Sequence, residues 1–352
     1  MHSDTYDLVV VGAGPAGASA ARAAGHNGVQ VLLIDARTNP GSPVQCAEYV
    51  PNQVRGYVPL VKGAVVQKID TLLTFINDEL ASTLAGPGYM LDRRVFDAGL
   101  VDAAREAGAE VCSSTKAIAK TEHGLIVSHN CQEPVAVKCR VIIGADGPRS
   151  TVGEWMNSRN QNFMVGLQYN LPLSQPQYST DIYFKPEYHG GYAWLFPKGW
   201  HANVGVGVSL SHKERLPRLL DEFITRLVWE DKIRGTRPAA KTSGLIPVGG
   251  PIPITQTGNM LLAGDAAGLA HPVTGGGIMN AIVSGQIAGQ TAAQAIEQND
   301  LKVLSQYPQR WQEVLGRFLD RGVQQRLKMD RGWTEDRAGF ERLIKRTWIS
   351  FN

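Results

Sequence analysis

Three glycines near the start of the chain have the spacing of a diphosphate-binding turn. Gly12, Gly14 and Gly17 follow an apolar run and open an alanine-rich segment, which predicts a strand, a tight turn and a helix. Backbone N–H groups at the start of that helix would face the diphosphate. A second apolar run, residues 29–34, ends at Asp35, whose carboxylate can accept hydrogen bonds from the ribose of an adenosine. We therefore predict a dinucleotide-binding unit here.

A second glycine-rich segment, residues 258–281, again predicts a strand, a loop and a helix. Asp265 stands at the strand end and suits a hydrogen bond to the ribityl chain of a flavin. The N–H groups that follow Gly275 would open a helix toward the flavin pyrimidine, where the helix dipole stabilises the negative charge of a reduced flavin. NAD and FAD share the adenosine diphosphate half that the first unit binds. The second segment is therefore what favours FAD.

Three side chains near these segments are candidate proton donors for a redox reaction. Cys46 and Glu48 lie in a turn-rich loop soon after Asp35, and His271 lies in the second glycine-rich segment. Each can act as a general acid if it lies within hydrogen-bond reach of the reacting carbon or flavin. An unpaired cysteine is often only a small buried apolar residue. The residues alone leave the choice among the three open.

A third segment, residues 141–150, carries the sequence Gly144-Ala145-Asp146-Gly147 after an apolar strand. The order Gly-x-Gly-x-x-Gly, Gly-Ala-Asp-Gly and Gly-Asp-Ala-Ala resembles the FAD-dependent group that contains the aromatic hydroxylases, the squalene epoxidases and the geranylgeranyl reductases. The resemblance extends from about residue 6 to about residue 298. It implies that one FAD is bound jointly by the three segments.

Two details are similar to the geranylgeranyl reductase branch of that group. Gly268 stands where the hydroxylases typically carry histidine, and residues 191–199 resemble the substrate-cavity strand of the reductases. Alternation along a strand places the aromatic residues of this segment on one face. The resemblance implies that these side chains and one loop proline contact an isoprenoid, namely Tyr192, Trp194, Phe196 and Pro272.

The resemblance also implies which residues contact the cofactor. Reductases of this family often carry a cysteine near the flavin, usually followed by a glycine cluster, whereas Ala47 and Glu48 follow Cys46 here. That departure leaves the substrate and the reaction open. An arginine from the helix predicted near residues 91–108 is expected to contact the flavin or its phosphates. The predicted cofactor residues are Gly12, Gly14, Pro15, Ala16, Gly17, Asp35, Ala36, Arg37, Cys46, Ala47, Arg93 or Arg94, Asp146, Gly147, Gly264, Asp265, Gly275, Gly276, Gly277 and Ile278.

Three functions fit this pattern. The leading prediction is reduction of an isolated carbon–carbon double bond, in which flavin N5 passes hydride to one carbon and a nearby acid protonates the other in a water-free pocket. One alternative is a monooxygenase that hydroxylates an aromatic ring, in a small molecule or in a tryptophan of a partner protein. Another is an assembly factor that binds FAD without catalysis.

The source of electrons is predicted from a missing motif. A dedicated NADPH site usually brings a second glycine fingerprint, and the only candidate, Gly205-Val-Gly207, lacks its third glycine. We therefore expect transient binding of NAD(P)H, or an external carrier such as ferredoxin.

These elements predict an α/β fold with a Rossmann-like FAD domain of the glutathione reductase or hydroxylase type. Residues 1–75, 90–150 and 255–300 would form this discontinuous domain, with a small strand meander over residues 111–138. Residues 152–253 would form an α+β substrate domain on a mixed or antiparallel sheet. The segment 301–352 is predicted to be a helical, amphipathic tail, expected to pack over the FAD domain rather than to bind a membrane or partner.

Composition narrows the remaining possibilities. The 352 residues are 43% hydrophobic and 19% charged with a net charge of +3, and the basic residues form no long run, so nucleic acid is not an expected partner. The four cysteines have neither metal-site spacing nor the density of a disulfide scaffold, which predicts no metal and a cytoplasmic location. The N-terminus does not resemble a signal peptide, and no apolar run reaches membrane-spanning length. Membrane contact is therefore expected to be peripheral.

Overall fold

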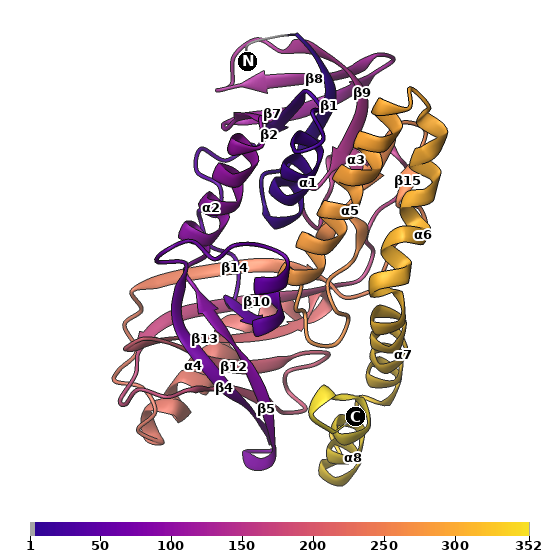
Figure 1. Cartoon of the computed structure of the whole chain (residues 1–352). Coiled ribbons are helices and arrows are strands. Elements are labelled where there is room, and N and C mark those ends of the chain that lie inside the picture. The colour runs from indigo at the N-terminus through magenta and orange to yellow at the C-terminus, as the bar shows by residue number, and fades with distance from the viewer. Residues whose placement is uncertain (1–3, 352) are drawn as a thin grey trace.

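The computed structural model describes residues 4–351, which form two large sheets with helices between and around them (Figure 1). The two apolar runs at the start of the chain lie side by side as parallel strands, Thr5–Val11 (β1) and Val31–Ile34 (β2). Both are buried, as expected for the centre of a parallel sheet. The dinucleotide-binding unit predicted from the sequence therefore has the predicted strand, turn and helix order.

Sheet A has the strand order β15-β16-β9-β1-β2-β6, with β7 and β8 extending from β9. Strand β16, which comes late in the sequence, pairs in parallel with β9, and β9 pairs in parallel with β1. Carboxyl ends of three segments far apart in sequence therefore meet at one edge. The remaining bounds are β6 Glu110–Cys112, β7 Thr115–Thr121, β8 Gly124–His129, β9 Val135–Gly144, β15 Gln256–Thr257 and β16 Met260–Leu262.

Two helices cross on one face of sheet A with their backbones in contact. They are Pro15–Gly25 (α1) and Ile278–Glu297 (α5), which lie side by side in Figure 1. A Cβ atom added at Gly285 would lie 2.1 Å from the carbonyl oxygen of Ala16, and one at Gly289 would lie 2.2 Å from that of Ala20. Only glycine permits this approach, which sets the two helices against each other. The other helices beside sheet A are α2, Arg93–Glu106, and α3, Thr151–Trp155.

Sheet B has the order β14-β10-β13-β12-β11-β4-β5-β3 and is mostly antiparallel, with β4 and β11 parallel. Helix α4, Leu216–Trp229, covers one face. Residues 65–75, within the range predicted for the FAD domain, instead belong to β4, which pairs with β5 in sheet B and, from Thr71 on, also with β11. The strands are β3 Tyr49–Pro51, β4 Val65–Ile76, β5 Glu79–Leu91, β10 Phe163–Pro172, β11 Ser179–Phe184, β12 Tyr192–Lys198, β13 His201–Ser209 and β14 Ala240–Pro247.

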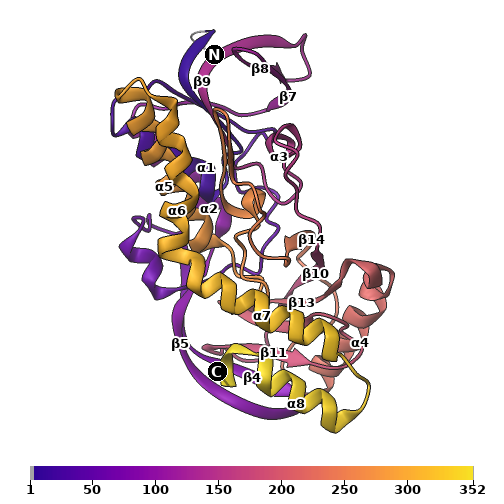
Figure 2. The ribbon, with the colours of Figure 1, turned by 90° about the vertical axis from the view of Figure 1, so that its right-hand side faces the viewer.

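The C-terminal tail covers both sheets (Figure 2). Its first part packs on the core of sheet A through Trp311, Leu315 and Leu319. Its second part joins the core on sheet B through residues that include Phe340 and Trp348. The predicted packing over the FAD domain thus describes only the first part. The tail helices are α6 Tyr307–Trp311, a π-helical turn Gln312–Gly316, α7 Arg317–Gly332, α8 Arg337–Thr347 and a 3₁₀ turn Ile349–Phe351.

Short 3₁₀ helices occur at Asn52–Gly56, Leu210–Arg215, Gly264–Ala267 and Leu301–Gln306. Within residues 4–351, no helix combines the length and the apolar character needed to cross a membrane.

Candidate active site

The first glycine turn forms a cradle at the start of α1. Gly12 has a φ of +99°, and a Cβ atom at Gly17 would lie 1.7 Å from the carbonyl oxygen of Gly12, so the turn closes tightly against the helix. A Cβ atom at Gly14 would meet no protein atom within 4 Å, and no side chain caps α1. The first N–H groups of a helix have no partner within the helix, and this open space lies beside them. This arrangement fits the diphosphate of FAD.

Asp35 links the first glycine turn to the segment that follows β2. Its carboxylate accepts hydrogen bonds from the backbone N–H groups of Ala13 and Arg37, each at 2.7 Å. Ala36 and Arg37 are exposed beside it, and Pro15 and Ala16 begin α1. The predicted adenosine-binding residues therefore lie together.

The second half of the cradle comes from the loop that precedes α5. Gly277 lies at the start of α5 without a side-chain cap, and its Cβ position is 3.1 Å from Oδ1 of Asp265. Asn160 donates to the backbone carbonyl of Asp265 at 2.8 Å, but within residues 4–351 no donor reaches the Asp265 carboxylate. Burial raises the pKa of Asp265 to about 6, against the opposing effect of the Arg93 guanidinium. The Asp265 carboxylate could therefore accept hydrogen bonds from the hydroxyls of a ribityl chain.

This buried carboxyl predicts a pH effect on the cofactor-free protein. A carboxyl whose pKa is raised to about 6 binds its proton more tightly in the folded state, so its stabilising effect fades as the pH rises from about 4 to about 6. His271, with its lowered pKa, acts in the opposite direction over the same range. The difference between the wild type and Asp265→Asn isolates the carboxyl. We expect Asp265→Asn to gain thermal stability relative to the wild type between pH 4.5 and pH 7, and equal shifts at both pH values would contradict this.

The structure distinguishes the two arginine candidates. Arg93 is only 14% exposed and makes two hydrogen bonds to the carboxylate of Asp97, at 2.7 and 2.8 Å. Its charge acts on both Cys46 and Asp265. Arg94 is 66% exposed and pairs with Asp92 at the surface. Arg93 is therefore the arginine that the structure brings to the site.

The Asp146 carboxylate has a structural role. Its carboxylate accepts hydrogen bonds from the Ser150 hydroxyl at 2.5 Å and from the backbone N–H of Thr151 at 2.6 Å. These bonds fix the start of α3, and the neighbouring Gly147 has a φ of +84°. Any contact of this segment with a cofactor would therefore come from its backbone rather than from the carboxylate.

His271 and Pro272 lie on the side of the glycine loop that faces α7. A Cβ atom at Gly322 would lie 2.8 Å from both His271 Nε2 and Pro272 Cδ, and the Phe318 ring lies 4.5 Å from the His271 ring. The backbone N–H of Thr274 donates to Nδ1 of His271 at 3.2 Å. Burial lowers the pKa of His271 to about 4, so its imidazole is neutral near pH 7. A neutral imidazole packed under α7 has no positive charge with which to act as a strong acid.

Cys46 lies on the opposite side, against sheet B. The backbone N–H of Glu48 donates to its sulfur at 3.2 Å, and Gln168 Nε2 donates to its carbonyl at 3.1 Å. Burial raises the pKa of the Cys46 thiol above its usual value, although the nearby Arg93 guanidinium opposes the shift. The sulfur therefore keeps its proton at neutral pH, which suits a proton donor.

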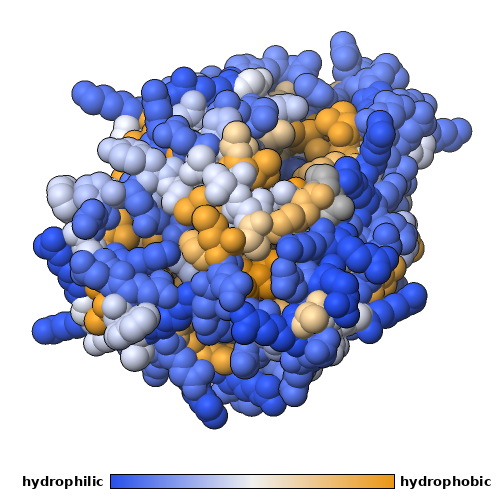
Figure 3. Space-filling model, turned by 90° about the horizontal axis from the view of Figure 1, so that it is seen from below, coloured by the Kyte–Doolittle hydropathy of each residue, from blue (hydrophilic) through white to orange (hydrophobic). Residues whose placement is uncertain are grey.

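The three aromatic residues of β12 share one face, as the alternation predicts. Tyr192 and Trp194 belong to the core on that face and Phe196 packs against it, whereas Ala193 and Leu195 face α4. We call Tyr192, Trp194 and Phe196 the aromatic wall. On the face of the molecule seen in Figure 3, apolar side chains surround a hollow.

Hydrogen bonds tie the aromatic wall to both cofactor-side loops. Trp194 Nε1 donates to Gln168 Oε1 at 2.9 Å, and Gln168 in turn holds the Cys46 loop. The Tyr192 hydroxyl donates to the carbonyl of Thr274 at 2.5 Å. Phe184 and Trp348 extend the wall: both rings contact Tyr192 in a tilted arrangement, and they contact each other edge to face. Gln168 and Trp348 were not predicted as site residues, because no sequence motif marks either of them.

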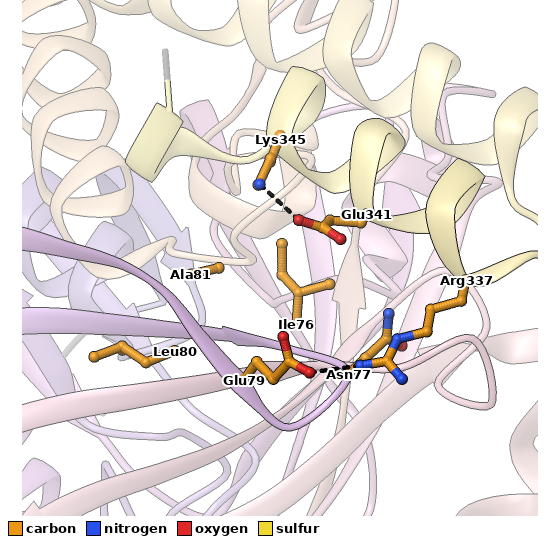
Figure 4. Close-up of a pocket in the computed structure, with 8 residues that line it drawn as sticks. All are labelled: Ile76, Asn77, Glu79, Leu80, Ala81, Arg337, Glu341 and Lys345. Atoms are coloured by element: carbon orange, nitrogen blue, oxygen red, sulfur yellow. Dashed lines mark hydrogen bonds and ion pairs between the residues drawn. The ribbon is translucent and has the colours of Figure 1, made fainter.

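A separate polar hollow lies between the tip of the β4–β5 hairpin and α8 (Figure 4). Its charged lining pairs within itself: Arg337 contacts Glu79 at 2.6 Å, and Lys345 contacts Glu341 at 2.6 Å. No predicted catalytic or cofactor residue lines it.

Family models match two parts of the chain. Residues 163–237 match the geranylgeranyl reductase catalytic domain, and residues 6–109 match the pyridine nucleotide-disulphide oxidoreductases. Among curated proteins, the digeranylgeranylglycerophospholipid reductase of Methanocella arvoryzae is 36% identical over 343 residues, covering 90% of this chain and 85% of the relative. That of Methanocaldococcus jannaschii is 34% identical over 331 residues, covering 88% and 83%. The chain belongs to the geranylgeranyl reductase family of FAD-dependent oxidoreductases.

Solved structures agree with this membership. A geranylgeranyl bacteriochlorophyll reductase-like protein of Thermoplasma acidophilum superposes with a TM-score of 0.86 at 29% identity, covering 98% of this chain and 96% of its own. The halogenase CndH superposes with a TM-score of 0.76 at 16% identity, covering 99% and 91%, which shows a shared fold alone. For this member of the geranylgeranyl reductase family, the predicted fold class and FAD chemistry are confirmed.

Proposed function

We propose that this member of the geranylgeranyl reductase family reduces isolated carbon–carbon double bonds in the isoprenoid chains of a lipid. The observation that carries the proposal is the hydrogen-bonded link from the backbone of Cys46 through Gln168 to Trp194, which holds the loop of a partly buried thiol against an apolar wall. The names of the curated relatives, digeranylgeranylglycerophospholipid reductases, support an isoprenoid lipid as the substrate.

The residues would divide the work as follows. The cradle at Gly14, Asp35 and Asp265 would hold FAD, which when bound supplies the hydride. The aromatic wall would hold the alkene and exclude water, because an unactivated double bond accepts hydride only if a proton arrives almost together with it. Cys46 would give that proton from Sγ to the second carbon. The Arg93 guanidinium would stabilise the thiolate that remains.

The test is an anaerobic turnover assay. The protein, loaded with FAD and reduced with dithionite, is mixed with a geranylgeranylated glycerophospholipid, and saturation of the chains is followed by mass spectrometry. We expect saturated product without oxygen. In a parallel reaction with an added aromatic compound, hydroxylation that needs oxygen, without saturation of the lipid, would instead support the monooxygenase alternative. Bound FAD with neither product would support the assembly factor.

We propose that electrons reach the site from transiently bound NAD(P)H or from a protein carrier. Gly205, which forms the pair Gly205-Val-Gly207, lies within β13, where a Cβ atom would meet the Trp194 ring at 2.2 Å. Gly205 therefore makes room for Trp194, and both glycines lie inside a strand and not in a nucleotide-binding turn. Stopped-flow reduction with NADPH, NADH and reduced ferredoxin will separate the donors.

We also propose peripheral contact with an anionic membrane through one end of sheet B. We call Tyr178, Trp200 and Trp229 the aromatic end; they are 61%, 65% and 85% exposed. The turns that carry them are joined by backbone hydrogen bonds, from Leu173 to Trp200 at 2.9 Å and from Ser174 to Lys232 at 3.0 Å. Exposed aromatic rings beside cations suit a bilayer interface with negative headgroups. Exposed basic residues nearby are Lys68, Arg234, Arg237 and Lys241.

Removing two of these rings should weaken vesicle binding. The double variant Trp200→Ala and Trp229→Ala is expected to bind phosphatidylglycerol-containing vesicles about tenfold more weakly, because apolar area at the interface is lost. Co-sedimentation measures the binding. Leu80→Ser removes an exposed apolar residue from the β4–β5 hairpin and serves as the control. Equal losses in both variants would place the membrane surface elsewhere.

A further inference from the structure

Glu48 has an unusual backbone and a fully engaged side chain. Its φ is +72°, a left-handed conformation that residues with a Cβ atom seldom adopt, and the residue is only 3% exposed. Such a conformation is strained and persists where surrounding contacts hold it. Glu48 is therefore held in place by its contacts with neighbouring elements.

The Glu48 carboxylate joins three separate elements. Oε1 accepts the backbone N–H of Arg93 at the start of α2, at 3.0 Å. Oε2 accepts Lys198 Nζ at the end of β12 at 2.7 Å and Asn203 Nδ2 of β13 at 2.9 Å. Asn203 Nδ2 also donates to the carbonyl of Ala47 at 3.2 Å. Three donors, one of them a cation, thus surround this carboxylate away from water.

The backbone of the same residue contacts the thiol. The N–H of Glu48 donates to Sγ of Cys46, while its side chain reaches Lys198, which lies two residues beyond Phe196 on the wall strand. Glu48 also lies beside Arg93, whose charge acts on Cys46. One residue therefore connects the sulfur, the arginine near it and the strand that carries the aromatic wall.

We propose that Glu48, through its ion pair with Lys198, is the positioning residue that fixes the Cys46 thiol relative to the aromatic wall. The proposal rests on the proposed function, in which Cys46 protonates an alkene held on that wall. Glu48 itself is not the donor: all of its hydrogen bonds to Arg93, Lys198 and Asn203 are to groups that donate, as expected for an acceptor-only carboxylate.

Glutamine cannot replace this carboxylate. It has one carbonyl oxygen and one NH₂ group, so in either orientation its NH₂ group faces another donor, either the Arg93 N–H or the pair formed by Lys198 and Asn203. Lys198→Met removes the cation from the same network while leaving the Glu48 side chain intact. It provides a second variant if Glu48→Gln fails to fold.

The first test needs no substrate. We expect iodoacetamide to modify Cys46 about tenfold faster in Glu48→Gln and in Lys198→Met than in the wild type, because losing charged hydrogen bonds makes local opening of the loop more frequent. Mass spectrometry of the peptide that contains Cys46 gives the rate. The matched control is Lys185→Met, which breaks an ion pair of 2.8 Å with Asp78 at the other end of sheet B. Unchanged rates in both Glu48→Gln and Lys198→Met would overturn the proposal.

The second test uses turnover and the Cys46→Ala background. Glu48→Gln alone is expected to lower kcat about 100-fold with an unchanged FAD content, as misplaced reacting groups do. In Cys46→Ala, adding Glu48→Gln should change the residual kcat by less than about threefold if Glu48 acts through the thiol. A full additional loss would identify an independent role and refute positioning. Absence of alkene reduction in the wild type would refute the proposed function while leaving the alkylation result valid.

Discussion

Gly14→Ala is expected to give a folded protein that carries no flavin colour. A Cβ atom at this position meets no protein atom within 4 Å, so the polypeptide can accommodate it. The same Cβ atom would project into the space that we assign to the diphosphate, which needs close backbone approach. The variant should therefore unfold near the wild-type apoprotein temperature and yet fail to bind FAD, as measured by thermal unfolding and by flavin absorbance after reconstitution.

Gly17→Ala provides the contrast. Its Cβ atom would lie 1.7 Å from the carbonyl oxygen of Gly12, so the turn itself must move. We expect this variant to lose both FAD and thermal stability, with little soluble protein. Gly56→Ala, in the 3₁₀ helix Asn52–Gly56, also meets nothing within 4 Å and should retain the yellow colour. Normal flavin content in Gly14→Ala would show that the diphosphate does not lie at this turn.

The second large effect is expected from Cys46→Ala. Removing a general acid typically costs a factor of about 10² to 10⁴ in rate, and an isolated alkene offers no alternative site for the proton. Product formation should fall by that amount, while the flavin spectrum and the rate of flavin reduction stay unchanged. Turnover with anaerobically reduced enzyme measures the loss.

Cys131→Ala is the matched control for this variant. Cys131 is an exposed, unpaired cysteine in the turn between β8 and β9, so its replacement should leave turnover unchanged. Wild-type turnover in Cys46→Ala would show that a group other than Cys46 donates the proton. A colourless Cys46→Ala protein would show instead that the thiol supports cofactor binding.

The sequence predicted the features that depend on residues close together in the chain. The turn at Gly12 and Gly17 follows from residues a few positions apart, and the shared face of Tyr192 and Trp194 follows from strand alternation. Both are present as predicted. The tail helices were likewise expected from their amphipathic pattern.

Features that depend on long-range pairing could not be predicted in the same way. Residues 71–76 pair in parallel with β11, a partner more than 100 positions later that no local pattern marks. Whether Arg93 or Arg94 faces the site depends on which side of α2 packs toward it. The two arginines are adjacent, directly after the N-cap residue Asp92, so sequence spacing does not distinguish them. The orientation of His271 depends on Gly322 in α7, which leaves room for its ring.

The backbone contact between α1 and α5 has a consequence for biosynthesis. The chain leaves the ribosome from its N-terminus, so α1 is made long before the glycines at 285 and 289 that receive it. Until then, one face of the nascent nucleotide-binding unit stays uncovered, and FAD cannot meet both halves of its cradle. A truncated product ending before α5 should therefore be a chaperone client, and completion of the holoenzyme should follow translation.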